Sequence, residues 1–178
     1  MYELYHLVLN AESEEKQELM FAVTLVDDDP LFREQMRDYL KSMKIEEIDM
    51  YASGEEFLAS MKENDKRLVV CDFDFGSEQR MNGLQVLEEI KKRNPQMPVI
   101  MLSAQDNMAM ALKTLRAGAV DYFIKGTENA FTSVLTSIMK VNEVQRLKKN
   151  EKDYITALIV GSVAATIIIG LLLYNLYK

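Results

Sequence analysis

Between positions 21 and 139 the chain alternates short apolar segments with amphipathic stretches. Four of the apolar segments are nearly uninterrupted, which is typical of parallel strands covered on both faces of a sheet. The stretches between them carry apolar residues at helical spacing, so the pattern predicts strands that alternate with helices in an α/β fold. The predicted strands are residues 21–26, a weaker 48–52, 68–71, 99–102 and 120–124.

The first predicted helix, residues 30–43, has the clearest start. Asp29 precedes it as a capping residue, and Pro30 suits the first turn. Its apolar residues are spaced to form one stripe toward the sheet, made of Leu31, Phe32, Met36, Leu40 and Met43. Further helices are predicted over 54–62, 83–93 and 107–117, and a last one begins near Glu128.

The C-terminal segment 154–177 contains 24 consecutive residues without a charge. As a helix it would be about 36 Å long, against a hydrocarbon core of about 30 Å, so it predicts a transmembrane helix. The preceding segment 140–153 carries five basic and three acidic residues, which favours a cytoplasmic location for the globular part. We therefore expect a single-pass protein of the inner (cytoplasmic) membrane. Its first 20 residues do not read as a signal peptide, because they are acidic and lack a long apolar run.

The pattern thus divides the chain into an extension at 1–20, a globular domain at 21–139, a helical stem at 140–153 and the transmembrane helix at 154–177. Within the extension, the first ten residues could add an edge strand. In the stem, Val141, Val144 and Leu147 continue the helical spacing, which fits either a short coiled coil or a solvated connector. Gly161 and Ala165 have the small-residue spacing of some helix pairs in membranes.

Composition and charge narrow the function classes. With 48% hydrophobic and 28% charged residues among 178, the chain is expected to fold rather than to be disordered. A single Cys rules out an internal disulfide, and a single His rules out a histidine cluster for a metal within one chain. The net charge of -7 argues against a nucleic-acid surface.

Polar side chains follow the predicted strands at the points where those strands end. They are Asp27, Asp28, Asp72, Ser103 and Lys125. Because parallel strands bring their carboxyl ends to one edge of a sheet, we expect these side chains to meet. Three neighbouring carboxylates repel one another unless a hard divalent cation such as Mg²⁺ lies among them. Lys125 and Ser103 could then bind phosphoryl oxygens, which leaves Asp72 as the nucleophile.

Over residues 21–139 the chain resembles the receiver domain of bacterial two-component response regulators. The motifs that carry the resemblance are LVDDDPLFR, VVCD, MNGLQVLEEIKK, MPVIMLSA and AGAVDYFIKG. The resemblance implies a flavodoxin-like fold, in which a doubly wound five-stranded parallel sheet of order 2-1-3-4-5 has helices on both faces.

The same resemblance implies a phosphoacceptor site. A phosphohistidine on a histidine kinase or phosphotransfer protein would donate its phosphoryl group to Asp72. Mg²⁺ would be held by Asp28, Asp72 and the backbone carbonyl of Asp74, with Asp27 acting through water. The chain would be a signalling module whose only chemistry is its own phosphorylation and dephosphorylation, and not an enzyme acting on other substrates.

The resemblance also implies how such a chain would respond. Lys125 and Ser103 would contact the acyl phosphate, and Ser103 and Tyr122 would form the switch. The responding surface would lie over residues 106–140, and the output would be protein contacts rather than DNA binding. A homodimer could form through that surface or through the transmembrane helix.

Two departures from the family pattern keep other interpretations open. Gly126 stands where most receivers have a proline after the lysine, which predicts a more mobile loop, and the loop after Asp72 is longer than usual. These departures support a pseudo-receiver, a membrane-tethered interaction domain that never carries phosphate. A third hypothesis is a haloacid dehalogenase-like phosphatase that uses Asp72 and Asp74. Against it, the acidic pair at 27–28 precedes the lysine instead of following it.

Overall fold

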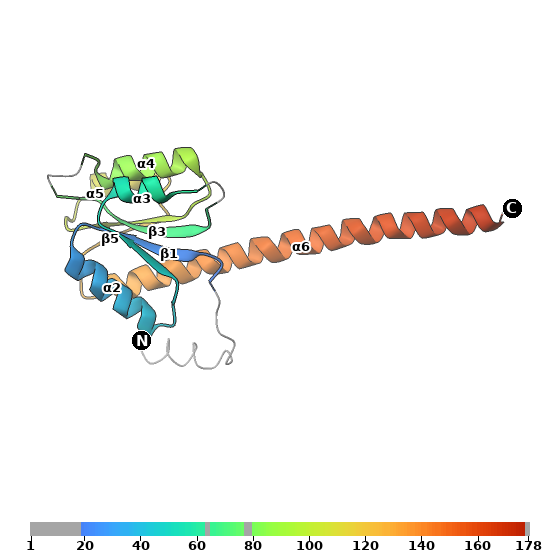
Figure 1. Ribbon diagram of the computed structural model, residues 1–178, viewed down its shortest axis with the longest axis horizontal. Coiled ribbons are helices and arrows are strands. Elements are labelled where there is room, and N and C mark those ends of the chain that lie inside the picture. The colour runs from blue at the N-terminus through green and yellow to red at the C-terminus, as the bar shows by residue number, and fades with distance from the viewer. Residues whose placement is uncertain (1–18, 63–64, 77–79, 177–178) are drawn as a thin grey trace.

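The structure is a computed structural model that describes residues 19–62, 65–76 and 80–176. Figure 1 shows a compact domain from which one long helix projects. In chain order, the elements are β1 (Ala22–Val26), α2 (Pro30–Ser42), β2 (Ile48–Tyr51), α3 (Gly54–Ser60), β3 (Arg67–Asp72), α4 (Gly83–Arg93), β4 (Val99–Ser103), α5 (Met108–Arg116), β5 (Asp121–Ile124) and α6 (Ala130–Leu176). The edge strand considered for the first ten residues lies outside the described residues.

The sheet has five parallel strands in the order β2-β1-β3-β4-β5, which confirms the predicted fold class. Helices α2 and α6 cover one face, and α3, α4 and α5 cover the other (Figure 1). Every residue of β3 and β4 is buried, because both strands lie inside the sheet and have helices on either side. This burial explains why the apolar runs in the sequence were nearly continuous.

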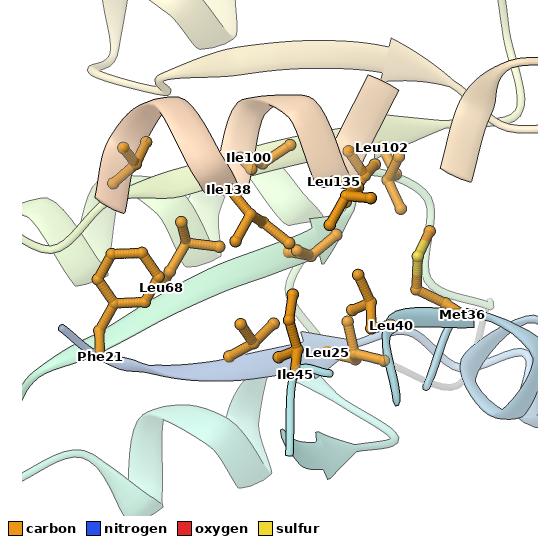
Figure 2. Packing of buried hydrophobic residues seen from close by; sticks show 14 residues of the cluster. Phe21, Leu25, Met36, Leu40, Ile45, Leu68, Ile100, Leu102, Leu135 and Ile138 are labelled. Atoms are coloured by element: carbon orange, nitrogen blue, oxygen red, sulfur yellow. The ribbon is translucent and has the colours of Figure 1, made fainter. Parts of the chain in front are cut away.

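The core on the α2 and α6 side joins segments that are far apart in the sequence (Figure 2). Met36 and Leu40 of α2 and Ile138 of α6 are fully buried against the strands. Each such side chain contributes roughly 1.5–3 kcal/mol by leaving water. The strand residues in this cluster include Leu25, Leu68, Ile100 and Leu102.

One detail of the predicted helices was wrong. Leu31 was expected to face the sheet, but it is 64% exposed because it lies five residues before Met36, on a different side of the helix. The last helix begins at Ala130, within two residues of the predicted start near Glu128. A turn separates it from β5, and in that turn Thr127 Oγ1 donates to the carbonyl of Ile124. The start of α2 is as predicted, since the side chain of Asp29 accepts the first N–H groups of the helix.

Helix α6 runs antiparallel to the strands and then leaves the domain. Its first turns follow the carboxyl end of β5, whereas its Ser137 hydroxyl donates to Asp121 at the amino end of that strand, at 2.7 Å. One turn later the side chain of Asn142 accepts the Met20 backbone N–H at 2.8 Å, just before β1 begins. Beyond Asn142 every residue of the helix as far as Asn175 is exposed, except the half-buried Gln145.

The projecting part of α6 continues without a break to Leu176 (Figure 1). Its most apolar window has a mean hydropathy of 2.5, and none of that window is buried. It is the one helix among the described residues that is long and apolar enough to cross a membrane. Val144 and Leu147 of the predicted stem are 49% and 57% exposed, so each leaves about half of its surface open to solvent.

Candidate functional site at the carboxyl edge of the sheet

The structure brings the predicted carboxylates together at the carboxyl edge of the sheet. Asp27 follows β1 and Asp72 ends β3, and these two strands are neighbours. Carboxylate oxygens of Asp27, Asp28 and Asp72 all lie within 4.8 Å of one another. Asp27 and Asp72 are buried, and Asp28 is half-buried. The topology therefore places three acidic groups in one small volume, as the strand ends indicated.

Lys125 lies among these carboxylates. Its Nζ is 2.6 Å from Asp27 Oδ2 and 2.7 Å from Asp72 Oδ2. The same ammonium lies 4.7 Å from the centre of the Phe32 ring, which shields it from water. The backbone N–H of Lys125 donates to the carbonyl of Ser103 at 2.7 Å and so continues the ladder between β4 and β5 past the end of β5.

The charges of the site are not balanced. The cluster holds three carboxylates, and the Lys125 ammonium pairs with two of them, Asp27 and Asp72. Asp72 Oδ1 is buried with no hydrogen-bond partner among the described residues. Burial, followed by the charge of Asp27, raises the pKa of Asp72 to about 6. Burial also raises the pKa of Asp27, against the effect of Lys125. Burial alone would lower the pKa of Lys125, but the charge of Asp72 and hydrogen bonds to both carboxylates raise it overall.

This imbalance predicts a pH dependence of stability. The pKa of Asp72 is raised from 3.8 to about 6 on folding, so the folded chain holds this proton more tightly than the unfolded chain does. We therefore expect the free energy of unfolding of the metal-free protein to decrease as the pH rises from about 4 to about 6. This group should account for a decrease of about 1–3 kcal/mol. Urea unfolding in detergent micelles, monitored by the near-ultraviolet circular dichroism of the tyrosines, measures this decrease. The fall should shrink in Asp72→Asn; an unchanged fall would assign it to another group.

Hydrogen bonds hold the long loop after β3 at both of its described ends, one to the site and the other to helix α3. The backbone N–H of Gly76 donates to Asp28 Oδ2 at 2.8 Å. On the other side, Glu55 Oε1 accepts from the backbone N–H groups of Arg80 and Met81 at 3.0 and 3.1 Å. The sequence predicted a longer loop here but not these attachments. The loop therefore orients Asp28 through one direct hydrogen bond.

Ser103 and Tyr122, the predicted switch pair, both form hydrogen bonds with the backbone of Gln105. Ser103 is fully buried, and its Oγ accepts the backbone N–H of Gln105 at 3.1 Å. The hydroxyl of the half-buried Tyr122 donates to the backbone carbonyl of Gln105 at 3.2 Å. A displacement of Ser103 would thus be felt at Tyr122 through the Gln105 backbone. No sequence pattern predicts this link, because it depends on a backbone path and not on a side-chain type.

Gly126 takes the position after the lysine with a φ of +75°, in the left-handed region that favours glycine. The peptide bond between Lys125 and Gly126 is trans. Lys125 itself is held by its two ion pairs and by its backbone hydrogen bond to Ser103. The missing proline therefore changes the turn, while the described contacts still direct the ammonium toward the carboxylates.

Gly83 is a site residue that the sequence analysis treated only as the start of a helix. A Cβ at this position would lie 2.1 Å from the carbonyl oxygen of Asp72 and 2.6 Å from the Cα of Phe73. The Gly83 N–H donates to the Phe73 carbonyl at 2.9 Å. Helix α4 therefore begins in direct contact with the backbone that carries Asp72, and a capping box between Asn82 and Gln85 fixes this start.

The arrangement suits transfer of a phosphoryl group to Asp72. The carboxylate has one unpartnered oxygen, a cation beside its other oxygen and two further acids that could share a metal ion. The oxygen donors of the cluster are those that a hard divalent cation prefers, and such an ion would relieve their mutual repulsion. Asp74 is exposed two residues further along the chain.

Comparisons with known proteins agree on one family. A family model described as the response regulator receiver domain matches residues 23–135. The chain is 33% identical to the Regulator of RpoS of Escherichia coli (strain K12) over 103 residues, which are 58% of this chain and 29% of that protein. It is 31% identical to the transcriptional regulatory protein MalR of Bacillus subtilis (strain 168) over 133 residues, 74% of this chain and 55% of that protein.

The chain thus spans less than two thirds of the length of these relatives. Among solved structures, the receiver domain of NtrX from Brucella abortus is 28% identical with a TM-score of 0.61, covering 68% of this chain and 98% of that one. A CheY-like receiver domain protein from Methanospirillum hungatei JF-1 is 25% identical with a TM-score of 0.62, covering 72% and 98%.

Proposed function

This chain belongs to the response regulator receiver family, and from that premise we propose that it is a membrane-tethered receiver that accepts a phosphoryl group on Asp72. Its relatives imply a histidine kinase or phosphotransfer protein as the donor. The observation that carries the proposal is the buried Asp72 carboxylate, which has one free oxygen beside two acids and a lysine. In the transfer, an Asp72 oxygen forms a bond to phosphorus as the N–P bond of the donor's phosphohistidine breaks. The imidazole keeps the electron pair and takes up a proton.

Receiver domains bind Mg²⁺ through acidic residues, and this chain has such a cluster. We assign the ion to Asp28, Asp72 and the backbone carbonyl of Asp74, with Asp27 reached through water. The unpartnered Asp72 Oδ1 and the excess negative charge fit this assignment. When bound, the ion would supply positive charge beside the phosphoryl oxygens. The Gly76 N–H would orient Asp28 toward it.

The remaining residues of the site act on the phosphoryl group and pass on the signal. The Lys125 ammonium, already beside Asp72, would pair with a phosphoryl oxygen. Ser103 would give up its bond from Gln105 to donate its hydroxyl to another oxygen, and Tyr122 would turn with the Gln105 backbone. This two-state element would change the surface over residues 106–140, where Met108, Leu112, Leu115 and Val120 are exposed.

The projecting half of α6 would anchor the receiver in the inner membrane, with the domain in the cytoplasm and the site able to meet a cytoplasmic partner. Protein contacts over 106–140, or dimerisation through the transmembrane helix, would carry the output without nucleic acid. The unbroken α6 supports this role because it joins the domain core directly to the apolar segment.

The chemistry can be tested with the full chain in detergent micelles. We expect incubation with Mg²⁺ and a radiolabelled acyl phosphate to place a stable label on Asp72. Rapid turnover of a phosphate ester without a stable label would instead indicate a phosphatase that uses Asp72 and Asp74. No label and no turnover would indicate a pseudo-receiver.

Mg²⁺ is expected to stabilise the folded chain, because an ion that binds only the folded cluster shifts the folding equilibrium. At a concentration one hundred times its dissociation constant, the gain is about 2.7 kcal/mol. Thermal unfolding with and without Mg²⁺ measures it. Asp28→Asn should lose most of this stabilisation by Mg²⁺. Glu46→Gln should keep it, because Glu46 is exposed in the loop before β2. Equal gains in both variants would contradict the assignment of Asp28.

The anchor can be tested by membrane fractionation. The full chain should stay in the membrane pellet through alkaline carbonate extraction. Ile168→Arg should release a large fraction of it, because a charge near the centre of a transmembrane helix costs about 2.5–3.5 kcal/mol. Ile168→Leu is the matched control and should behave like the unaltered chain. Quantitative extraction of the unaltered chain would contradict the anchor.

A further inference from the structure

The direction of α6 decides which end of the receiver faces the membrane. The helix starts beside the carboxyl ends of the strands and leaves the domain at their amino ends, where Asn142 contacts Met20. The phosphoacceptor site lies at the opposite end, because Asp72 and Lys125 are at the carboxyl edge. If α6 enters a bilayer, the amino ends of the strands face that bilayer and the site faces away from it (Figure 1).

Among the described residues, the end of the domain that would face the bilayer exposes more basic than acidic side chains, although the whole chain has a net charge of -7. We define the amino-end surface as the last turns of α2, α4 and α5 together with the loops that follow α2 and α3. Among the described residues, its exposed basic side chains are Lys41, Lys44, Lys62, Lys66, Lys92, Arg93, Lys113 and Arg116. Its exposed acidic side chains are Glu46 and Glu47.

Some of these basic residues have a local explanation. Basic side chains in the last turn of a helix offset the helix dipole, which accounts for Lys41, Arg116 and the end of α4. Glu89 also pairs with Lys92 and Arg93. Lys44 and Lys66, however, lie in loops between a helix and a strand, outside the last turn of any helix. These two residues are therefore the most informative positions on the surface.

The length of the stem brings this surface within electrostatic range of lipid headgroups. Tyr154, the first residue of the uncharged segment, lies twelve positions after Asn142, which corresponds to about 18 Å of helix. The headgroup layer occupies roughly 5–8 Å of that length. The remaining gap of about 10–13 Å is close to the Debye length of about 8–10 Å, and a typical tilt of about 20° would narrow it on one side.

We infer that the amino-end surface binds the anionic lipid headgroups of the membrane that holds α6, through charge complementarity at the end of the domain from which the helix leaves. This inference rests on the proposed membrane anchor. It gives the tethered receiver a preferred orientation, in which the acidic carboxyl edge with Asp72 is presented to the cytoplasm and to the phosphodonor. The stem between Asn142 and Tyr154 carries four basic and three acidic side chains, so it adds a net single positive charge to the same attraction.

The test uses the full chain in nanodiscs of phosphatidylcholine alone or of equal parts phosphatidylcholine and phosphatidylglycerol. A fluorophore is attached at Gln96→Cys, in the exposed loop before β4 at the amino end, or at Asp106→Cys near the carboxyl edge. Cys71 is fully buried and does not compete for the label. A spin-labelled headgroup lipid serves as the quencher.

We expect anionic lipid to increase quenching at position 96 at least twofold and to leave position 106 unchanged. High salt should remove the increase, because the attraction is screened. Lys44→Glu combined with Lys66→Glu should also remove it, whereas Arg80→Glu in the loop before α4 should not. Equal quenching at position 96 in both lipids, with the chain inserted, would overturn this inference alone. Failure of the chain to enter nanodiscs would overturn the anchor and this inference together.

Discussion

Replacing Asp72 with Asn is expected to abolish phosphoryl transfer to the chain. The amide keeps the shape of the side chain but is a far weaker nucleophile than the carboxylate, so no acyl phosphate forms. The neighbours Asp27 and Asp28 remain, but Asp27 is occupied by Lys125 and Asp28 by the Gly76 N–H. We expect a loss of at least 100-fold in label from a radiolabelled acyl phosphate with Mg²⁺, with the folded domain retained.

Asp74→Asn is the matched control for this experiment. The proposed receiver chemistry uses only the backbone carbonyl of Asp74, and the side chain is exposed, so the variant should be labelled like the unaltered chain. A phosphatase that used Asp74 as its acid would be inactivated by the same change. Undiminished label in Asp72→Asn would show that another residue accepts the phosphoryl group and would end the proposed function as stated.

Replacing Gly83 with Ala is expected to be the most damaging small substitution in the domain. The new Cβ would lie 2.1 Å from the Asp72 carbonyl oxygen and 2.6 Å from the Phe73 Cα, and both are backbone atoms. Backbone at the end of the buried strand β3 cannot turn aside as a flexible side chain would. Either α4 moves away and loses the buried contacts of Leu84 and Leu87, or β3 is distorted. We expect a loss of about 2–4 kcal/mol in the free energy of unfolding.

Urea unfolding of the full chain in micelles measures this loss, and the rate of Asp72 labelling reports on the distortion of the site. Gly161→Ala is the control, because among the described residues nothing outside the adjacent backbone of its own helix lies within 4 Å of a Cβ at that position. It should leave the unfolding of the domain unchanged. Stability of Gly83→Ala equal to that of the unaltered chain would mean that α4 does not approach Asp72 as closely as the structure shows.

Much of this fold follows from local patterns in the sequence. Buried parallel strands need apolar side chains on both faces, so their positions could be predicted from nearly continuous apolar runs. The start of α2 could be predicted from two neighbouring residues. The Asp29 side chain accepts the free N–H groups of the first turn, and Pro30 suits the first helical position because it has no N–H to satisfy. Parallel strands also share a carboxyl edge, so the meeting of Asp27, Asp72 and Lys125 was predictable without knowing any distance.

Other parts of the site were decided only by tertiary structure. The bond from Gly76 to Asp28, the bonds of Ser103 and Tyr122 to Gln105 and the contact of Gly83 with the Asp72 backbone join atoms whose approach depends on loop paths and helix placement. No residue type or spacing encodes these approaches, because backbone groups are the same in every residue. The sequence by itself therefore determined which side chains gather at the carboxyl edge. Only the packed backbone decided which of them are held by hydrogen bonds and which remain unpartnered. It also decided from which end of the domain α6 leaves toward its apolar segment.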